Sequence, residues 1–344
     1  MNTRQGLTLT RPELDEVVAS NDKNRFAIDG TGTRIRASQG HSVPVDLGLT
    51  PSAATERPVP RHRCPVPAER ERRVADKSRP VHVPARSHTV TSARRRRART
   101  DPTGRCAVLY PVIAEAARRA GANAVGLIDI GCSAGLNLNV ARVGITYSTG
   151  QKLGDPSSPV QMSCSLVGDR PVPAHAMPEV VARVGIDTDP VDVTDAEEAR
   201  WLRAGLSPGQ PEQAAKLDAE IALAATDPPV LLQGDPVDAL PDAFARVPAD
   251  ALPVVTTTWA LSRLPLERRL RFLHRLDDAA TDRAVAWVSA EGVGVAPAVP
   301  TMGDRRASGH SIIGLAMFGH SALHAEAVGR CWSRGRLLAW LADS

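Results

Sequence analysis

Residues 125–135 are Val-Gly-Leu-Ile-Asp-Ile-Gly-Cys-Ser-Ala-Gly, and this stretch decides the fold of the chain. An apolar run of this kind, ending in an acid, is typical of a buried parallel strand. Gly131 and Gly135 follow four residues apart, and such glycines let a loop run close to a ligand before a helix begins. The stretch therefore predicts a nucleotide-type site in a doubly wound α/β domain.

Composition divides the chain into two unlike parts. Residues 1–100 carry 20 basic and 10 acidic residues, a net charge of +10, whereas the rest carries 22 and 28, a net charge of −6. Of all 344 residues 42% are hydrophobic but only 3% are aromatic, so a core must consist of Ala, Val and Leu. We expect an α/β domain over residues 101–344 and a separate segment over residues 1–100.

The segment of residues 1–100 is predicted to be a disordered, basic tail. Residues 43–90 are dense in Pro and Arg, and Arg94 to Arg97 form a basic run. Such sequence buries too little apolar surface to offset its chain entropy. A basic arm on nucleic acid is the alternative. Because no aromatic residues alternate with these arginines to stack on bases, nucleic acid is not the expected partner.

The cysteines and the hydropathy pattern indicate a cytoplasmic protein. The five cysteines are widely spaced without a CxxC pair, which disfavours a disulfide framework or a zinc site. No apolar stretch approaches the roughly 18 residues of a membrane span. We therefore expect no membrane association and no bound metal.

Regular alternation of strands and helices begins near residue 103. The expected strands are 125–130, 181–187, 229–233, 252–258, 284–290, 311–318 and 321–328, and the expected helices are 105–120, one from about 134, 194–202, 211–225, 239–246 and 265–279. Residues 144–168 are predicted to form an inserted β-hairpin with its turn at Gly154-Asp155-Pro156. This order predicts a mostly parallel, seven-stranded sheet in which the terminal hairpin adds one antiparallel strand.

Three acidic residues fall at the C-terminal ends of the first three strands. Asp129 precedes the glycine loop, Asp187 ends the second strand, and Asp235 comes after Gly234 beyond the third. Ligands of open α/β sheets bind at these strand ends. A carboxylate after the second strand can accept both hydroxyls of a ribose, and one after the third can accept from an adenine amino group. Each acid alone also fits a turn, but three in register are more specific.

Two other site types compete for the same loop. Gly131-Cys-Ser133-Ala-Gly135 fits the G-x-S-x-G motif of a serine hydrolase, although such a strand ordinarily follows several earlier ones. A dinucleotide site requires G-x-G-x-x-G, and Ser133 stands where the second glycine belongs. A carboxylate beside the loop also disfavours phosphate. A ligand with a ribose, an adenine and a positive centre, such as S-adenosylmethionine, suits the three carboxylates better.

Two residues near later strand ends are candidates for catalysis. Trp259 follows the fourth strand, where a substrate contact or core packing is expected. Glu291 follows the fifth strand and is either an acid or base or a turn residue. His310, His320 and His324 lie close in sequence, and His320 and His324 have H-x-x-x-H spacing, but this pair straddles a predicted turn and metal binding is not expected.

The motifs resemble a known family. Asp-Ile-Gly-Cys-Ser-Ala-Gly, Gly-Ile-Asp187 and Gly234-Asp-Pro-Val-Asp-Ala-Leu-Pro are similar to the first three cofactor segments of class I methyltransferases. Together with Gly104-Arg-Cys-Ala, Gly154-Asp-Pro-Ser-Ser-Pro, Ala199-Arg-Trp-Leu and Ala290-Glu-Gly, they resemble the bacterial family known as domain of unknown function 2332. The resemblance runs from about residue 95 to the end of the chain.

The resemblance implies a methyltransferase-like, Rossmann-type fold that binds S-adenosylmethionine. Asp129, Gly131, Ser133 and Gly135 would then hold the methionine end, Asp187 the ribose, and Asp235 with Gly234 the adenine. A non-catalytic nucleotide-binding module stays an alternative. The methyl acceptor is a small molecule or another compound that the sequence does not identify.

The chain departs from the resembled families in two places. Residues 1–92 lack the helical region that precedes the Gly-Arg-Cys segment in the family, which a divergent tail or a mistranslated reading frame would explain. The aromatic Asn-Pro signature of nucleic-acid N-methyltransferases is also absent after the fourth strand. This second departure disfavours methylation of nucleic-acid bases.

Overall fold

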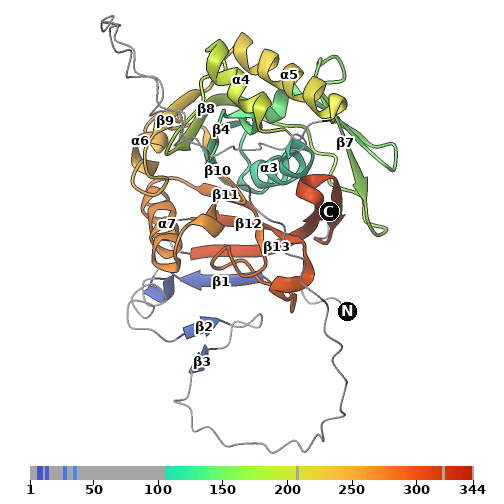
Figure 1. Cartoon of the computed structure of the whole chain (residues 1–344). Coiled ribbons are helices and arrows are strands. Elements are labelled where there is room, and N and C mark those ends of the chain that lie inside the picture. The colour runs from blue at the N-terminus through green and yellow to red at the C-terminus, as the bar shows by residue number, and fades with distance from the viewer. Residues whose placement is uncertain are drawn as a thin grey trace, which may run out of the picture. The chain divides into compact units, whose positions relative to one another are not determined.

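A computed structural model of the protein describes residues 6–10, 12–14, 26–28, 34–36, 105–206, 209–319 and 322–342. Five parallel strands form one end of its main sheet, with β9 at the edge (Figure 1). β4 (Ala124–Ile130) has β8 (Glu179–Asp187) and β9 (Val230–Gln233) on one side, and β10 (Leu252–Thr258) and β11 (Val285–Gly292) on the other. All five lie within two residues of the predicted bounds, which confirms the α/β class and the run of parallel strands.

The sheet is larger than the sequence predicted. Antiparallel strands β12 (Ser311–Phe318), β13 (Ala322–Trp332) and β14 (Leu337–Trp340) continue it beyond β11. β7 (Gln161–Leu166), β5 (Gly144–Tyr147) and β6 (Lys152–Gly154) then follow β14, and β1 (Gly6–Thr10) pairs with β13. The described part of the chain thus has twelve strands in one mixed sheet, not seven. The short strands β1, β6 and β14 lack the long apolar run that reveals a central strand.

The insertion at residues 144–168 is part of this sheet and is not a simple hairpin. β5 and β6 pair antiparallel around a turn at residues 148–151, whereas β5 and β7 pair in parallel. The predicted turn at Gly154-Asp155-Pro156 exists, but it connects β6 to β7. Gly154 has φ +76°, and the Asp155 carboxylate accepts hydrogen bonds from the N–H and the hydroxyl of Ser157. These are features of an Asx-type turn, which sequence alone does not assign to one strand pair.

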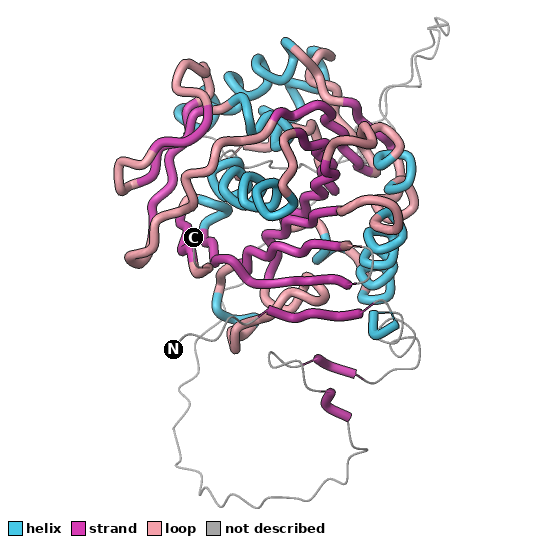
Figure 2. The backbone as a smooth tube through the Cα atoms, turned by 180° about the vertical axis from the view of Figure 1, so that it is seen from behind, coloured by secondary structure: helices cyan, strands magenta, loops and turns pink. Residues whose placement is uncertain are grey.

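Helices cover both faces of the sheet, as Figures 1 and 2 show from opposite sides. α3 (Cys106–Ala120) packs on one face, and α6 (Leu240–Phe244) and α7 (Leu266–Ala279) pack on the other. We call these the α3 face and the α7 face. Alternate residues of each strand point to opposite faces of the sheet. Leu127 packs on the α3 face, while Ile128 and Trp287 pack on the α7 face. Trp287 is fully buried against the ring of Phe272.

The helices largely confirm the predicted ones, and their ends have local causes. α3 ends at Gly121, whose left-handed φ of +65° suits glycine. α4 (Ala196–Ala204) begins two residues after the expected start at 194, because Asp195 caps it and accepts from two backbone N–H groups. α5 (Pro211–Thr226) packs with α4 against η1 (Leu136–Arg142). The helix expected from about residue 134 is therefore a 3₁₀ segment, kinked at Asn139.

The prediction of a disordered segment over residues 1–100 is wrong for residues 6–10 and 12–14. The former are strand β1 of the main sheet, and the latter form a helical turn. β2 (Phe26–Ile28) and β3 (Arg34–Arg36) form a separate antiparallel pair. The remaining residues of the predicted tail, including the Pro/Arg-rich part, lie outside the described residues. Among those described, no helix combines the length and apolar character needed to cross a bilayer.

Candidate functional site

The candidate site lies where the chain reverses direction across the sheet. After β4 the chain adds β8 and β9 on one side of it, and then crosses back to add β10 and β11 on the other. The carboxyl ends of these five parallel strands share one edge. Open α/β sheets bind ligands at such a reversal point. The sequence-predicted site residues lie in the last two positions of these strands or in the loops that follow them.

Asp187 holds the glycine loop against the end of β8. Its Oδ2 accepts a hydrogen bond from the N–H of Ser133 at 3.0 Å, and Oδ1 accepts from the N–H of Asp189 at 2.9 Å. The N–H of Gly131 donates to the carbonyl of Ile186 at 2.8 Å. The carboxylate is 2% exposed. The structure thus brings Gly131, Ser133 and Asp187 together, as the sequence predicted, and Asp187 fixes the loop conformation.

Asp129 lies in a buried polar network on the α3 face. It is 1% exposed and accepts from the hydroxyl of Thr256 at 2.7 Å and from the amide of Asn137 at 3.2 Å. Asn137 belongs to η1 and Thr256 to β10. The network therefore joins β4 to the neighbouring strand β10 and to the η1 segment that follows the glycine loop. Asn137 and Thr256 were not predicted as site residues, since nothing in the sequence pairs either with Asp129.

Ser133 is the strained residue of the loop. Its φ is +53°, in the left-handed region that favours glycine, and its buried hydroxyl has no hydrogen-bond partner among the described residues. A serine nucleophile needs a base within hydrogen-bond reach, and the described structure gives Ser133 Oγ none. Gly135 also has a positive φ, +69°, and a Cβ there would lie 2.8 Å from the Pro229 ring. Gly135 thus serves the loop conformation and its packing.

We expect Ser133→Gly to stabilise the protein by about 1 kcal/mol, because it removes left-handed strain and a buried hydroxyl without a partner. Greater freedom of glycine in the unfolded chain offsets part of this gain. Urea unfolding measures the change. Ser133→Ala is the matched control, since it removes the hydroxyl but keeps the strain. Equal stabilities of the two variants would show that the left-handed backbone at residue 133 does not lower the stability of the wild-type protein.

Asp235 faces another direction than Asp187. Its Oδ1 accepts from the N–H of Val237 at 2.8 Å and forms an ion pair with Arg268 of α7. The side chain is 40% exposed. The backbone of Gly234 nevertheless reaches Asp187, because its N–H donates to the Asp187 carbonyl at 2.9 Å. The loops after β4, β8 and β9 are therefore hydrogen-bonded to one another, while the Asp235 carboxylate lies toward α7.

Trp259 directly follows β10, as predicted, and has a strained backbone with φ +54°. Its indole N–H donates to the hydroxyl of Ser311 at 2.8 Å, and the guanidinium of Arg105 lies 5.2 Å from the ring centroid. Arg105, at the N-cap position of α3, also donates to the Thr258 hydroxyl at 3.0 Å. Ala260, the residue after Trp259, lies beside the glycine loop, since a Cβ at Gly131 would be 3.2 Å from its Cβ. Arg105 was not predicted as a site residue.

Glu291 lies within β11 and is fully buried, so the expectation that it follows the strand is wrong. Its Oε1 accepts from the N–H groups of Ala260 and Leu261 at 2.9 and 3.0 Å, while Oε2 has no hydrogen-bond partner among the described residues. Burial raises the pKa of Glu291 to about 7, although those two N–H groups and the charge of Arg269 oppose the shift. Glu291 thus positions the turn that carries Trp259.

The histidines occupy separate places. His310 Nε2 lies 2.9 Å from the Asp304 carboxylate, which also accepts from Arg330, and His324 contacts Thr8. His320 lies outside the described residues. Within the described ranges, no group of three His, Cys, Asp or Glu side chains is arranged to hold a metal ion.

Comparison with known proteins divides the chain at residue 65. Residues 1–65 match the RNA 2'-phosphotransferase, Tpt1 / KptA family. Over 48 residues the chain is 58% identical to a "Probable RNA 2'-phosphotransferase" of Hahella chejuensis, which is 14% of this chain and 26% of that protein. Over 44 residues it is 68% identical to the Streptomyces coelicolor protein of the same description, 13% and 23% of the two chains. The chain thus spans about a quarter of the length of these curated relatives.

The remaining, larger part of the chain matches a second family over residues 65–340. This match begins earlier than the resemblance expected from about residue 95. It includes all five parallel strands, the glycine loop and the candidate site residues. Because it spans well over half of the chain, it decides the family. The chain belongs to the bacterial family described as "Uncharacterized protein conserved in bacteria (DUF2332)".

Proposed function

We propose that this protein binds S-adenosylmethionine at the carboxyl edge of β4, β8 and β9, and that it is a methyltransferase-like protein. One observation carries the proposal: the glycine loop after β4 is hydrogen-bonded to the acid that ends β8, at the point where the strand order reverses. This is the position at which open α/β sheets accept nucleotide-type ligands. The bound cofactor would supply a methyl group on a positively charged sulfur.

The chemistry of the edge fits such a ligand. The carboxylates of Asp129 and Asp187 favour a cation and can accept hydroxyl groups, since each carboxylate has about four acceptor positions. The buried hydroxyl of Ser133 lacks a partner in the described structure and is available to a ligand. The contacts of Asp235 described above use Oδ1, so Oδ2 of this partly exposed group can accept from an adenine amino group. Trp259, which is followed by Ala260 beside the glycine loop, and Arg105, which lies over the Trp259 ring, are candidates for contact with the acceptor.

Ligand binding to these groups requires the loop to move. Asp129, Ser133 and Asp187 are each at most 5% exposed. A ligand reaches their side chains only when a covering segment is displaced, and η1 with the Asn137 side chain covers Asp129. We therefore expect hydrogen exchange in residues 131–139 to change when the cofactor binds.

Titration calorimetry of the full chain with S-adenosylmethionine tests the proposal, with NAD and ATP as comparison ligands. We expect binding of S-adenosylmethionine alone, and a weakening of at least tenfold in Asp235→Ala. Asp218→Ala is the matched control, because this exposed aspartate also forms an ion pair with an arginine, Arg203, but lies on α5. Absence of S-adenosylmethionine binding by the folded wild-type protein would disprove the proposal.

The alternatives give other results in the same samples. A serine hydrolase predicts covalent labelling of Ser133 by a fluorophosphonate, and no base among the described residues is hydrogen-bonded to the Ser133 hydroxyl. A non-catalytic module predicts binding without methylation of any acceptor. The names of the relatives suggest RNA 2'-phosphotransfer, but the match covers about a quarter of such a protein. We do not extend that activity to this chain.

A further inference from the structure

The edge of β13 is completed by a strand from the far N-terminal part of the chain. β1 pairs antiparallel with residues 322–326, from Gly6 opposite Glu326 to Thr10 opposite Ala322. β13 pairs with β12 on its other side, and its last four residues, 329–332, pair with β14. Without β1, the segment 322–326 would present an open edge of N–H and C=O groups, which is a template for another strand.

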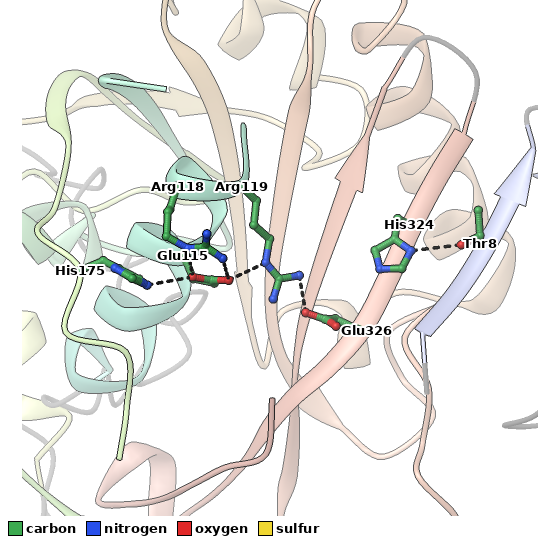
Figure 3. Close-up of polar contacts among 7 residues, drawn as sticks. All are labelled: Thr8, Glu115, Arg118, Arg119, His175, His324 and Glu326. Carbon is green, nitrogen blue, oxygen red and sulfur yellow. Dashed lines mark hydrogen bonds and ion pairs between the residues drawn. The ribbon is translucent and has the colours of Figure 1, made fainter. Parts of the chain in front are cut away.

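The two faces of β1 have different chemistry. Leu9 enters the core of the α7 face and is 9% exposed, and Leu7 packs partly buried against the same core. On the opposite face Thr8 Oγ1 lies 3.1 Å from His324 Nδ1 (Figure 3). Gly6 lies against the same imidazole, since a Cβ there would be 3.0 Å from Cε1 of His324. The edge therefore accepts leucines at alternate positions with small residues between them.

A short helical turn completes the contact. The Glu13 carboxylate accepts from both the N–H and the hydroxyl of Thr10 at 2.9 Å, which fixes the turn at residues 12–14. This turn directs Leu14 into the core of the α7 face, where it is 1% exposed. Residues 6–10 and 12–14 thus contribute two anchoring side chains to this core, Leu9 and Leu14.

The acceptor side is fixed independently of β1. Glu326, opposite Gly6, forms an ion pair with Arg119 of α3, and Arg119 also binds the buried Glu115 (Figure 3). Glu115 is further bound by Arg118 and lies 3.2 Å from His175. These contacts join β13 to α3 within the DUF2332 match, whereas β1 belongs to the phosphotransferase match. Donor and acceptor strand thus come from parts of the chain with different relatives.

We propose that residues 322–326 of β13 form a binding site for an extended peptide, and that residues 6–14 are a tethered, exchangeable ligand of this site. The ligand class is a segment with leucines at alternate positions, small or threonine residues between them, and a leucine-bearing turn after the strand. Main-chain pairing supplies affinity, and the pockets for alternate side chains supply specificity, as in other cases of strand addition. The tether gives the chain's own segment a high effective concentration.

Fluorescence anisotropy with a labelled peptide of residues 5–15 tests the proposal on the full chain. In Leu9→Asp the chain's own strand carries a buried charge and should leave the edge, so the peptide should bind this variant at least 100-fold more tightly than wild type. A peptide with aspartate in place of both Leu9 and Leu14 is the control, and it should bind neither protein. Failure of the wild-type peptide to bind the folded variant would overturn the proposal, and so would binding of a second copy of the chain in preference to the peptide.

Hydrogen exchange on the unmodified chain keeps the proposal testable if Leu9→Asp does not fold. The amides of β1 and of residues 322–326 should exchange together and at least tenfold faster than those of β10, because strand release opens this edge alone. Equal protection of β1 and β10 would show that β1 is an inseparable part of the sheet. If Leu9→Asp does not fold and the amides of β1 and β10 are equally protected in wild type, the proposal that β1 exchanges with a peptide is overturned.

Discussion

Asp187→Ala should lower the free energy of unfolding by about 3 kcal/mol or more, the largest effect that we expect from a single site residue. The substitution leaves the buried N–H of Ser133 without its acceptor, at about 1–3 kcal/mol, and it also removes the part-buried hydrogen bond of the Asp189 N–H, at about 1 kcal/mol. These bonds are 3.0 and 2.9 Å long, and the carboxylate is 2% exposed. Denaturant unfolding measures the change, and the midpoint of thermal unfolding should fall by roughly 10 °C.

The same variant should also lose cofactor binding, and the two effects can be separated. Asp187→Asn keeps the size of the side chain, but its amide group replaces one acceptor by a donor that faces an N–H. We therefore expect only partial recovery of stability. Asp235→Ala should cost about 1 kcal/mol or less, because its ion pair with Arg268 is partly exposed. Equal destabilisation by Asp187→Ala and Asp235→Ala would contradict the role assigned to Asp187.

The parallel strands and the helices that pack on them were predictable because their sequence signals are local. The run at residues 124–130 and the strand 252–258 are long and apolar, and glycine or proline marks the ends of α3 and α7. The rest of the sheet depends on tertiary contacts. β14 is four residues long, and its pairing with β13 and β7 has no counterpart in the sequence pattern. β1 is held by an edge that lies more than 300 residues away in the chain.

The candidate site was predictable in its backbone and less so in its side chains. Strand ends gave the positions of Asp129 and Asp187, because parallel strands end at one edge. Their partners, Asn137 and Thr256, follow from packing of η1 and β10, which no local pattern encodes. The direction of Asp235 likewise depends on Arg268 of another helix, so its ion pair was not foreseen.

The charge of Glu291 should make stability depend on pH near neutrality. Burial raises its pKa to about 7 in the folded protein, from 4.5 as the ordinary value. The folded state therefore binds the proton more tightly than the unfolded state, and protonation favours folding. Its contribution is fully present below pH 4.5, is lost as the pH rises to about 7, and then stays constant. A difference of about 2.5 pKa units corresponds to roughly 3 kcal/mol.

Glu115 should act in the opposite pH range. Burial raises its pKa, but hydrogen bonds and charges of Arg118 and Arg119 outweigh this effect and lower the pKa to about 2. Its contribution is therefore present above pH 4.5 and is lost as the pH falls toward 2. The two glutamates thus predict slopes of opposite sign in separate pH windows.

Glu291→Gln isolates the first of these slopes. The amide oxygen can still accept from the N–H groups of Ala260 and Leu261, but the side chain no longer titrates. The variant should match wild type near pH 4 and exceed it by about 3 kcal/mol at pH 8, where wild type keeps a buried charge. Urea unfolding at both pH values gives the difference in the free energy of unfolding between the two proteins. The contributions of all other titrating groups cancel, because both proteins contain them. If the stability difference between Glu291→Gln and wild type does not change with pH, the buried carboxyl of Glu291 titrates as it does in the unfolded chain, which would contradict the prediction.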